Sequence, residues 1–377
     1  MHVLIVGAGI GGLATAVALR RQGFGAMVLE RRSELREIGA GLTIWPNGVR
    51  ALRALGTVPA EGEFELRTIG IKTWRGKTIV ETDCSHYRDR YGAPALPMHR
   101  AELQRALLSA LDTDAIVPSS QVLRFSEGQG SVSLEGANGL TWSGDLVVGA
   151  DGLRSTIRRQ LLADGEPRYT GVTVWRGVTG AHMADLAPGE SWTFLGPGFE
   201  FGFMPMIDRR VYWFASKEAP ARERAWAAGH RAELLERHEG WPHPVLDLIQ
   251  STDEADVVRT DIYDRPPARR WSGTRVTLLG DAAHPMTPHA SQGACQALED
   301  AVDLAAVLKD SSNIADALAL YELRRVGPAN EAVRASSLSG RVIRVKHPLA
   351  RWLLDSALAR IPVGVRRQQE DRLLRSR

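Results

Sequence analysis

The sequence predicts an α/β protein: a Rossmann-like domain interleaved with a mainly antiparallel-sheet domain, followed by C-terminal helices. Three observations support this prediction. The chain opens with a short apolar strand, a glycine-rich turn and an apolar helical run. Its middle alternates apolar and polar residues with the period of two that is typical of strands. With 377 residues, the chain is also longer than one core usually holds, which indicates two closely packed domains.

The composition is that of an ordinary folded protein. Hydrophobic residues make up 44% of the chain and charged residues 24%. Every apolar run is far shorter than the roughly 18 residues that span a membrane, so we expect no integral membrane segment. Two cysteines and the lack of a signal-peptide pattern favour a cytoplasmic location. We expect a monomer or a homodimer.

The charge is unevenly distributed along the chain. Residues 341–377 contain ten Lys/Arg and three Asp/Glu. This basic segment indicates either a solvated face of C-terminal helices or an anionic surface or partner. It lacks the interleaved aromatic residues of a base-stacking surface, so nucleic-acid binding is not expected.

The first motif is the N-terminal turn. The strand HVLIV precedes Gly7, Gly9 and Gly12, a G-x-G-x-x-G pattern that opens a helix. Gly7 permits the tight turn, Gly9 lets the backbone approach a pyrophosphate, and Gly12 allows close helix–strand packing. The exposed N–H groups at the helix start favour a phosphate. The next apolar run ends at Glu30, whose carboxylate suits ribose hydroxyls and disfavours a 2′-phosphate. The pattern therefore predicts a site for NAD or FAD, with NADP the least suitable.

Two further strands deliver aspartates at their carboxyl ends. Asp151 follows the strand in DLVVGADGLRSTIRR, and Asp281 follows the strand in RVTLLGDAAHPMTP. Ligands of α/β sheets bind at such strand ends, and a cofactor with a polyol middle needs separated acceptors, which favours FAD. Pro285 and Pro288 stiffen the second loop. The helix that begins at Gly293 would direct its N–H groups toward electron-rich flavin oxygens.

These motifs together resemble the single-component FAD-dependent aromatic hydroxylases of the para-hydroxybenzoate hydroxylase fold, especially the salicylate, urate and 6-hydroxynicotinate hydroxylase-like branch. Tetracycline-inactivating monooxygenases and zeaxanthin epoxidase-like enzymes are relatives of that family. The resemblance covers roughly residues 1–330 and rests on GAGIGG with Glu30, GADGLRSTIR and GDAAHPMTPHASQGACQALEDA. It implies bound FAD, transient NADPH or NADH, O₂, and hydroxylation of an aromatic or polyketide-like small molecule through a flavin C4a-hydroperoxide.

The resemblance also implies individual cofactor contacts. Arg100 matches an arginine that reaches the FAD phosphate and ribityl region, and Gln104 lies one turn further along the helix. Val122 matches a residue whose backbone meets the adenine, and Asp151 belongs to a motif tied to both FAD and the nicotinamide cofactor. The expected cofactor-binding set is Gly7, Gly9, Gly12, Glu30, Arg31, Arg100, Gln104, Val122, Asp151, Asp281, Pro288, Gly293 and Ala294.

Neither a metal site nor a separate nicotinamide domain is expected. His284 has no second histidine or cysteine at a ligand spacing around it. Only one G-x-G-x-x-G lies between a strand and a helix, so NAD(P)H is expected to bind transiently over the FAD groove, near Asp151 and Arg154.

Two positions depart from the family pattern. Ser291 stands where the usual Gly-Gln-Gly has its first glycine. If the backbone there needs a positive φ, serine costs about 1 kcal/mol or more. Phe201 is interpreted as standing where some urate-type members carry an arginine for an anionic substrate. On that interpretation the pocket is less suited to a small anion.

The expected substrate side lies in the alternating strands of the middle of the chain. Tyr212 and Met204 are the residues placed nearest a ligand. His289 directly follows Pro288, and an imidazole suits proton transfer near neutral pH. We expect His289 to orient or deprotonate a substrate hydroxyl, with Tyr212 as a possible second catalytic partner. The alternative is a surface histidine that only caps the loop.

The predicted organisation leaves two other functions open. One is an FAD-dependent reductase of a prenyl or polyene substrate, and the other is a non-catalytic flavin-binding protein. The expected segments are 1–70, 96–170 and 265–310 for the FAD-binding domain, 71–95 and 171–264 for the substrate domain, and 311–377 for the C-terminal helices.

Overall fold

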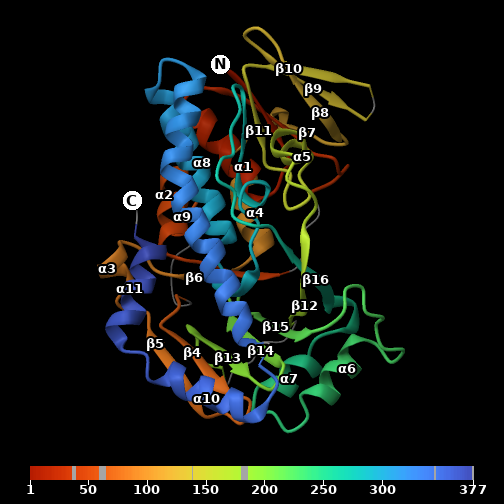
Figure 1. The fold of residues 1–377 in the computed structure, drawn as a ribbon, viewed down its shortest axis with the longest axis vertical. Coiled ribbons are helices and arrows are strands. Elements are labelled where there is room, and N and C mark those ends of the chain that lie inside the picture. The colour runs from red at the N-terminus through yellow and green to blue at the C-terminus, as the bar shows by residue number, and fades with distance from the viewer. Residues whose placement is uncertain (36–39, 59–64, 138, 180–185, 344, 376–377) are drawn as a thin grey trace.

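The computed structural model describes residues 1–377 apart from 36–39, 59–64, 138, 180–185, 344 and 376–377 (Figure 1). A five-stranded sheet in the order β17-β11-β1-β2-β7 lies in the upper part of the figure. All of its neighbouring strands are parallel. The strands are β1 (His2–Val6), β2 (Gly25–Leu29), β7 (Ile116–Val117), β11 (Leu146–Gly149) and β17 (Val276–Leu278). The turns that follow β1, β11 and β17 therefore lie side by side at one edge of the sheet.

Helices packed in layers support this sheet. Helix α1 packs against α8, and α8 packs against α9. Helix α1 is apolar on nearly every side, as its sequence IGGLATAVALRR suggests, and all its residues except Gly11, Arg20 and Arg21 are buried. The helices of this half are α1 (Ile10–Arg21), α2 (Pro46–Leu55), α4 (Arg100–Leu108), α5 (Thr156–Leu162), α8 (Gly293–Asp310) and α9 (Ile314–Ile343).

Two small sheets flank the parallel sheet. One is an antiparallel three-stranded sheet in the order β10-β9-β8 at the top of Figure 1. The other pairs β3 with β6, and it lies toward the lower half of the molecule. Their strands are β3 (Gly41–Ile44), β6 (Leu96–His99), β8 (Val122–Glu127), β9 (Val132–Gly136) and β10 (Thr141–Gly144).

A seven-stranded sheet in the order β16-β12-β15-β14-β13-β4-β5 forms the lower half. Its neighbouring strands are antiparallel except β13 and β4, which run parallel. The strands are β4 (Thr68–Thr73), β5 (Thr78–Asp83), β12 (Arg168–Val178), β13 (Glu190–Leu195), β14 (Phe199–Pro205), β15 (Val211–Glu218) and β16 (Val258–Asp264). The mixed α/β prediction, with a mainly antiparallel second sheet, is confirmed.

The two faces of this sheet differ in their surroundings. On one face, Phe201 and Trp213 stack at 5.6 Å and belong to a core shared with α6 (His230–Arg237) and α7 (Val245–Gln250). Side chains alternate along a strand, so the residues between these aromatics lie on the other face. The pairing register places Glu200 opposite Ser216, Gly202 opposite Phe214 and Met204 opposite Tyr212.

That second face looks toward the half of the molecule that contains the parallel sheet. We call this half, which carries the expected cofactor residues, the cofactor-side half. Thr43 on β3 lies with its Oγ1 3.1 Å from the sulfur of Met204. A Cβ on Gly41 would lie only 2.3 Å from the ring of Tyr212, so the glycine lets that ring pack directly on the β3 backbone. We call this second face, carrying Glu200, Met204 and Tyr212, the inner face of the sheet.

The C-terminal part is helical, as predicted. Helix α9 runs through most of the length of the molecule in Figure 1. Helix α10 follows it along the lower sheet, and α11 contacts α2 and α9. The bounds are α10 (Pro348–Ala359) and α11 (Val363–Leu374), while α3 (Tyr87–Tyr91) packs beside α2. Among the described residues, we find no helix with the length and hydropathy of a membrane span.

Candidate functional site

The turn after β1 has the geometry that its glycines predict. Gly7 has a φ of +103°, and a Cβ there would lie 2.6 Å from the carbonyl oxygen of Ala150. A Cβ on Gly12 would lie 1.9 Å from the carbonyl oxygen of Gly7, so only glycine permits this close approach of helix and turn. A Cβ on Gly9 would have no other atom within 4 Å, so space is open beside this residue. Helix α1 has no side-chain cap and no acidic residue in its first turn, which leaves its N–H groups available to an anion.

Glu30 is fixed beside this turn by backbone hydrogen bonds. Its carboxylate accepts one from the N–H of Ala8 at 2.8 Å and one from the N–H of Arg32 at 3.0 Å. The side chain is thereby held at the mouth of the glycine turn. Arg31 is exposed next to it, and Val122 is buried at the start of β8.

The turn after β17 places Asp281 next to the start of α8. A Cβ on Gly293 would lie 3.8 Å from Oδ1 of Asp281. Asp281 keeps an exposed surface although it lies close to the start of α8. Removal from bulk solvent raises the pKa of Asp281, while the positive charges of His284 and Arg100 act to lower it. Arg100, at the start of α4, therefore lies close enough to Asp281 for its charge to act on that carboxyl.

Helix α8 also begins without a side-chain cap or an acidic residue in its first turn. Its N–H groups, near Gly293 and Ala294, therefore offer a second uncapped helix start close to Asp281. Pro288 is exposed in the 3₁₀ turn Pro288–Ala290 that precedes it. Ser291 closes that turn with φ 49° and ψ 30°, in the left-handed region. The expected strain at Ser291 is thus present.

A buried polar group holds the loop after β17 in place. Asp300 on α8 accepts a hydrogen bond from the N–H of Gly280 at 3.0 Å. Its other contacts are His284 Nε2 at 2.6 Å and Arg325 Nε at 2.8 Å. Burial raises the pKa of Asp300, but His284 and Arg325 outweigh it and hold the pKa below its ordinary value. His284 therefore has a structural partner, and the described residues contain no cluster of three or more metal-ligating side chains.

Arg158 is a residue that sequence reasoning missed. It is buried on α5, and its Nη1 donates hydrogen bonds to the carbonyl oxygens of Ala282 and Ala283 at 3.0 and 2.6 Å. Asp164 pairs with the same guanidinium at 2.5 Å. The GADGLRSTIR motif thus ties the turn after β11 to the turn after β17. The available signal was its place inside that motif, in a helix that follows the turn directly.

Asp151 has a structural partner of its own. Its carboxylate accepts hydrogen bonds from Ser155 Oγ at 2.5 Å and from the N–H of Thr156 at 2.7 Å, which caps the start of α5. A role toward a cofactor stays a prediction for this residue. Gln104 is half-buried on α4, and Arg154 lies 5.2 Å from the ring of Tyr263.

His289 faces the inner face of the sheet. Its side chain is 8% exposed, and its Nε2 lies 3.9 Å from Oε1 of Glu200. A Cβ on Gly340 of α9 would lie 2.8 Å from His289 Cε1, so the imidazole is also packed against that helix. The alternative of a surface histidine that only caps the loop does not agree with this position.

The interpretation of Phe201 needs correction. Phe201 lies on the far face of the sheet, stacked on Trp213, and does not face the cofactor-side half. The residue of this segment on the inner face is Glu200, because side chains alternate along β14. Glu200 was not singled out from the sequence, since neither a motif nor spacing marks it.

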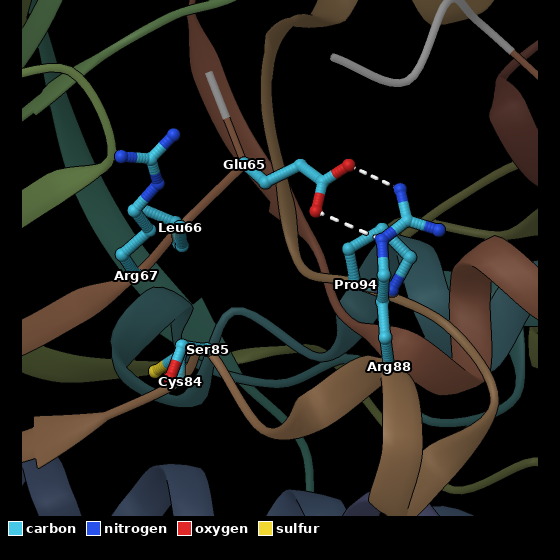
Figure 2. A pocket seen from close by; sticks show the side chains of 7 residues that line it. All are labelled: Glu65, Leu66, Arg67, Cys84, Ser85, Arg88 and Pro94. Carbon is cyan, nitrogen blue, oxygen red and sulfur yellow. Dashed lines mark hydrogen bonds and ion pairs between the residues drawn. The ribbon is translucent and has the colours of Figure 1, made fainter. Parts of the chain in front are cut away.

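Figure 2 shows a separate hollow at the edge of the seven-stranded sheet. It lies between the ends of β4 and β5 and helix α3, and the Glu65–Arg88 ion pair spans part of it. The hollow contains none of the candidate cofactor or catalytic residues. It is therefore a surface depression distinct from the candidate site.

Known proteins share this architecture. The profile of a family described as FAD binding domain matches residues 1–336. The chain belongs to this FAD-binding family. It is 40% identical over 370 residues to the aurachin C monooxygenase/isomerase of Stigmatella aurantiaca, a match that covers 95% of this chain and 94% of that protein. It is 36% identical over 338 residues to the FAD-dependent urate hydroxylase of Klebsiella pneumoniae, covering 88% of each.

Solved structures agree. Klebsiella pneumoniae HpxO complexed with FAD and uric acid superposes with a TM-score of 0.92 at 32% identity, covering 99% of this chain and 97% of that one. A salicylate hydroxylase substrate complex shares the fold, with a TM-score of 0.73 at 22% identity. The chain is an FAD-dependent monooxygenase, and FAD is its cofactor.

Proposed function

We propose that this monooxygenase uses NAD(P)H and O₂ to hydroxylate an aromatic or polyketide-like small molecule held between the flavin site and the inner face of the seven-stranded sheet. The proposal rests on one observation. The edge where the turns after β1, β11 and β17 meet adjoins a loop whose His289 approaches Glu200 of that sheet at 3.9 Å. A cofactor at the strand ends would thus lie next to a face that carries polar and aromatic side chains.

The chain's own residues suit FAD. The open space at Gly9 and the uncapped start of α1 suit the pyrophosphate, and Glu30 suits the adenosine ribose. Asp281 and Arg100 form an acceptor and a cation for the ribityl and phosphate region, with Gln104 on the same helix as Arg100. The remaining assigned contacts are Gly7, Gly12, Arg31, Val122, Asp151, Pro288, Gly293 and Ala294. When bound, the flavin supplies the activation of O₂ with electrons taken from NAD(P)H.

The protein's tasks are then to bind, orient and shield. The segments 1–70, 96–170 and 265–310 would hold the cofactor, and 71–95 with 171–264 would hold the substrate, with 311–377 as the helical support. NAD(P)H would bind over the same groove near Asp151 and Arg154. His289 would orient or deprotonate a substrate hydroxyl, and Tyr212, packed on Gly41, would be its second partner.

The test is a substrate screen on the purified protein. FAD content is measured first. Oxidation of NADH and of NADPH is then followed with aurachin C and urate, the compounds named for two of its relatives, and with a wider set of phenols, N-heteroaromatics and polyketides. We expect stoichiometric FAD and at least one compound that stimulates NAD(P)H and O₂ consumption together with a hydroxylated product. Reduction of a polyene without O₂ uptake would instead indicate the reductase function, and flavin binding without any turnover would indicate a non-catalytic protein.

A further inference from the structure

Glu200 is a buried carboxyl on the inner face of the substrate sheet. Its side chain is 7% exposed, and it lies on β14 two residues from Gly202 and four from Met204. Its Oε1 accepts a hydrogen bond from Ser216 Oγ at 2.7 Å. A fully buried carboxylate is costly unless a cation or several donors compensate it. Its presence in this place therefore calls for an explanation.

The surroundings of Glu200 contain few compensating groups. From the cofactor-side half, His289 approaches at 3.9 Å, and from the neighbouring strand Ser216 supplies one hydroxyl. Burial is the dominant cause that raises the pKa of Glu200 to about 7, and the hydrogen bond from Ser216 acts in the opposite direction. The carboxyl thus changes its charge near neutral pH, next to an imidazole that can share the proton.

Among the described residues, the other charged and titratable groups on the inner face include Arg176, Tyr212 and, at the exposed end of β15, Glu218, which is paired with Lys346. Arg176 is on β12, two strands from Glu200, a separation of roughly 10 Å between backbones. Its Nη1 donates a hydrogen bond to Thr260 Oγ1 at 2.6 Å. Burial raises the pKa of Tyr212, Arg176 lowers it, and the charge of Glu200 adds to the increase. Arg176 is therefore engaged with Thr260 and Tyr212, two strands away from Glu200.

Resting on the proposed monooxygenase function, we propose that Glu200 and His289 together form a substrate anchor that selects a neutral aromatic molecule with an N–H or O–H donor and rejects aromatic carboxylates. The carboxylate oxygen and the imidazole nitrogen can accept a hydrogen bond from such a donor. A substrate carboxylate would instead bring a second negative charge beside a buried acid whose described polar neighbours are Ser216 and the imidazole of His289. Met204 and Phe214 on the same face supply apolar contact for the ring.

The pH dependence has a defined sign. Above pH 7 the Glu200 carboxyl is mainly ionised, because its pKa is about 7, and repulsion of an anionic ligand is then largest. Below this pH the carboxyl is increasingly protonated and the repulsion declines. Discrimination between a neutral ligand and its carboxylate analogue should therefore increase from about pH 6 to about pH 8.

Ligand binding to the FAD-loaded protein tests this directly, because the flavin spectrum reports it without turnover. The probes are neutral and anionic pairs of increasing size: phenol and 4-hydroxybenzoate, 3-hydroxybenzamide and 3-hydroxybenzoate, 2-naphthol and 6-hydroxy-2-naphthoate. For wild type at pH 8, we expect the neutral member of at least one pair to bind about 10-fold or more tightly than its carboxylate, the effect of about one pKa unit of like-charge interaction. Glu200→Gln should bring this ratio close to one and make it independent of pH.

Two further variants separate the anchor from general effects on folding. Ser216→Ala keeps the carboxyl but removes the hydrogen bond that lowers its pKa, so the pH at which discrimination appears should move upward. Glu218→Gln, on the same strand as Ser216 and ion-paired with Lys346 at the surface, is the matched control and should behave like wild type. Glu200→Gln should retain FAD and unfold at a temperature no lower than wild type at pH 8, because it removes a buried charge.

Three outcomes would overturn the anchor: carboxylates that bind as tightly as their neutral partners, a binding ratio unchanged in Glu200→Gln, or a panel in which no neutral member binds. These outcomes are distinct from failure of the proposed function. The predicted selectivity without any oxygenated product would leave the anchor in place and contradict the monooxygenase reaction on these molecules.

Discussion

Individual carboxylates have different roles near the strand ends of this protein. Asp300 and Asp151 are used internally, one to hold the loop after β17 and the other to cap α5. Asp281, in contrast, makes no such hydrogen bond among the described residues, and it lies beside Gly293 with part of its surface exposed. This difference predicts that Asp281 has its acceptor capacity available for the cofactor.

Replacement of Asp281 by alanine should therefore weaken FAD binding by about 1–3 kcal/mol, because a hydrogen bond to a charged acceptor is lost. The measurement is FAD affinity by fluorescence titration of the apoprotein. Asp310→Ala, at the exposed end of α8, is the control and should bind FAD like wild type. Unchanged affinity in Asp281→Ala would remove this residue from the site.

His289 offers a second test on a single side chain. In His289→Gln, flavin reduction by NAD(P)H should persist, while coupling of that reduction to hydroxylated product should fall by about 10²-fold or more, as for loss of a general base. Stopped-flow reduction and product yield are measured separately on a turnover substrate. Wild-type coupling with an unshifted pH profile would show that the imidazole takes no part.

Some of these residues could be predicted from the sequence and others could not. Gly7, Gly12 and Ser291 were predictable because their backbone demands are local and are written in adjacent residues. Arg158 and Glu200 were missed because their partners lie far away in the chain: the contacts of Arg158 with Ala282 and Ala283 span more than 100 residues. Phe201 was placed on the wrong face because a shift of one residue in a strand reverses every side chain.

At the scale of elements, the 3₁₀ turn Pro288–Ala290 connects the cofactor and substrate sides. It is closed by Ser291 in the left-handed region and is supported by Ser336 of α9, whose Oγ donates to the carbonyl of Thr287 at 2.5 Å. The N–H of Ala290 donates back to the same hydroxyl at 3.2 Å. Hydrogen bonds to α9 thus hold the turn in place, although the left-handed backbone at Ser291 is unfavourable for serine.

Ser291→Gly should relieve this strain and increase the free energy of unfolding by up to about 1 kcal/mol, since the penalty for a non-glycine residue there exceeds the entropy cost of glycine. Denaturant unfolding of the FAD-loaded protein measures it. Ala163→Gly, at the left-handed cap of α5, is a matched substitution outside the turn and should stabilise similarly. Destabilisation by Ser291→Gly alone would show that the serine hydroxyl has an unassigned role.

For the whole molecule, helix α9 connects the two halves. It contacts α8 through the Arg325–Asp300 pair and passes His289 at Gly340, close to its C-terminal end. It also runs along most of the long axis in Figure 1. The sequence predicted helices in this region but not that one of them supports the candidate site. Such support depends on packing between distant segments, which periodicity alone does not encode.

The central claim is that the chain is a monooxygenase that inserts one oxygen atom from O₂ into its substrate. The most direct measurement is mass spectrometry of the product after turnover with NAD(P)H under ¹⁸O₂. We expect one ¹⁸O atom per product molecule, with one NAD(P)H consumed for each. A product oxygen derived from water, or NAD(P)H consumption that yields only hydrogen peroxide with every stimulating compound, would contradict the account.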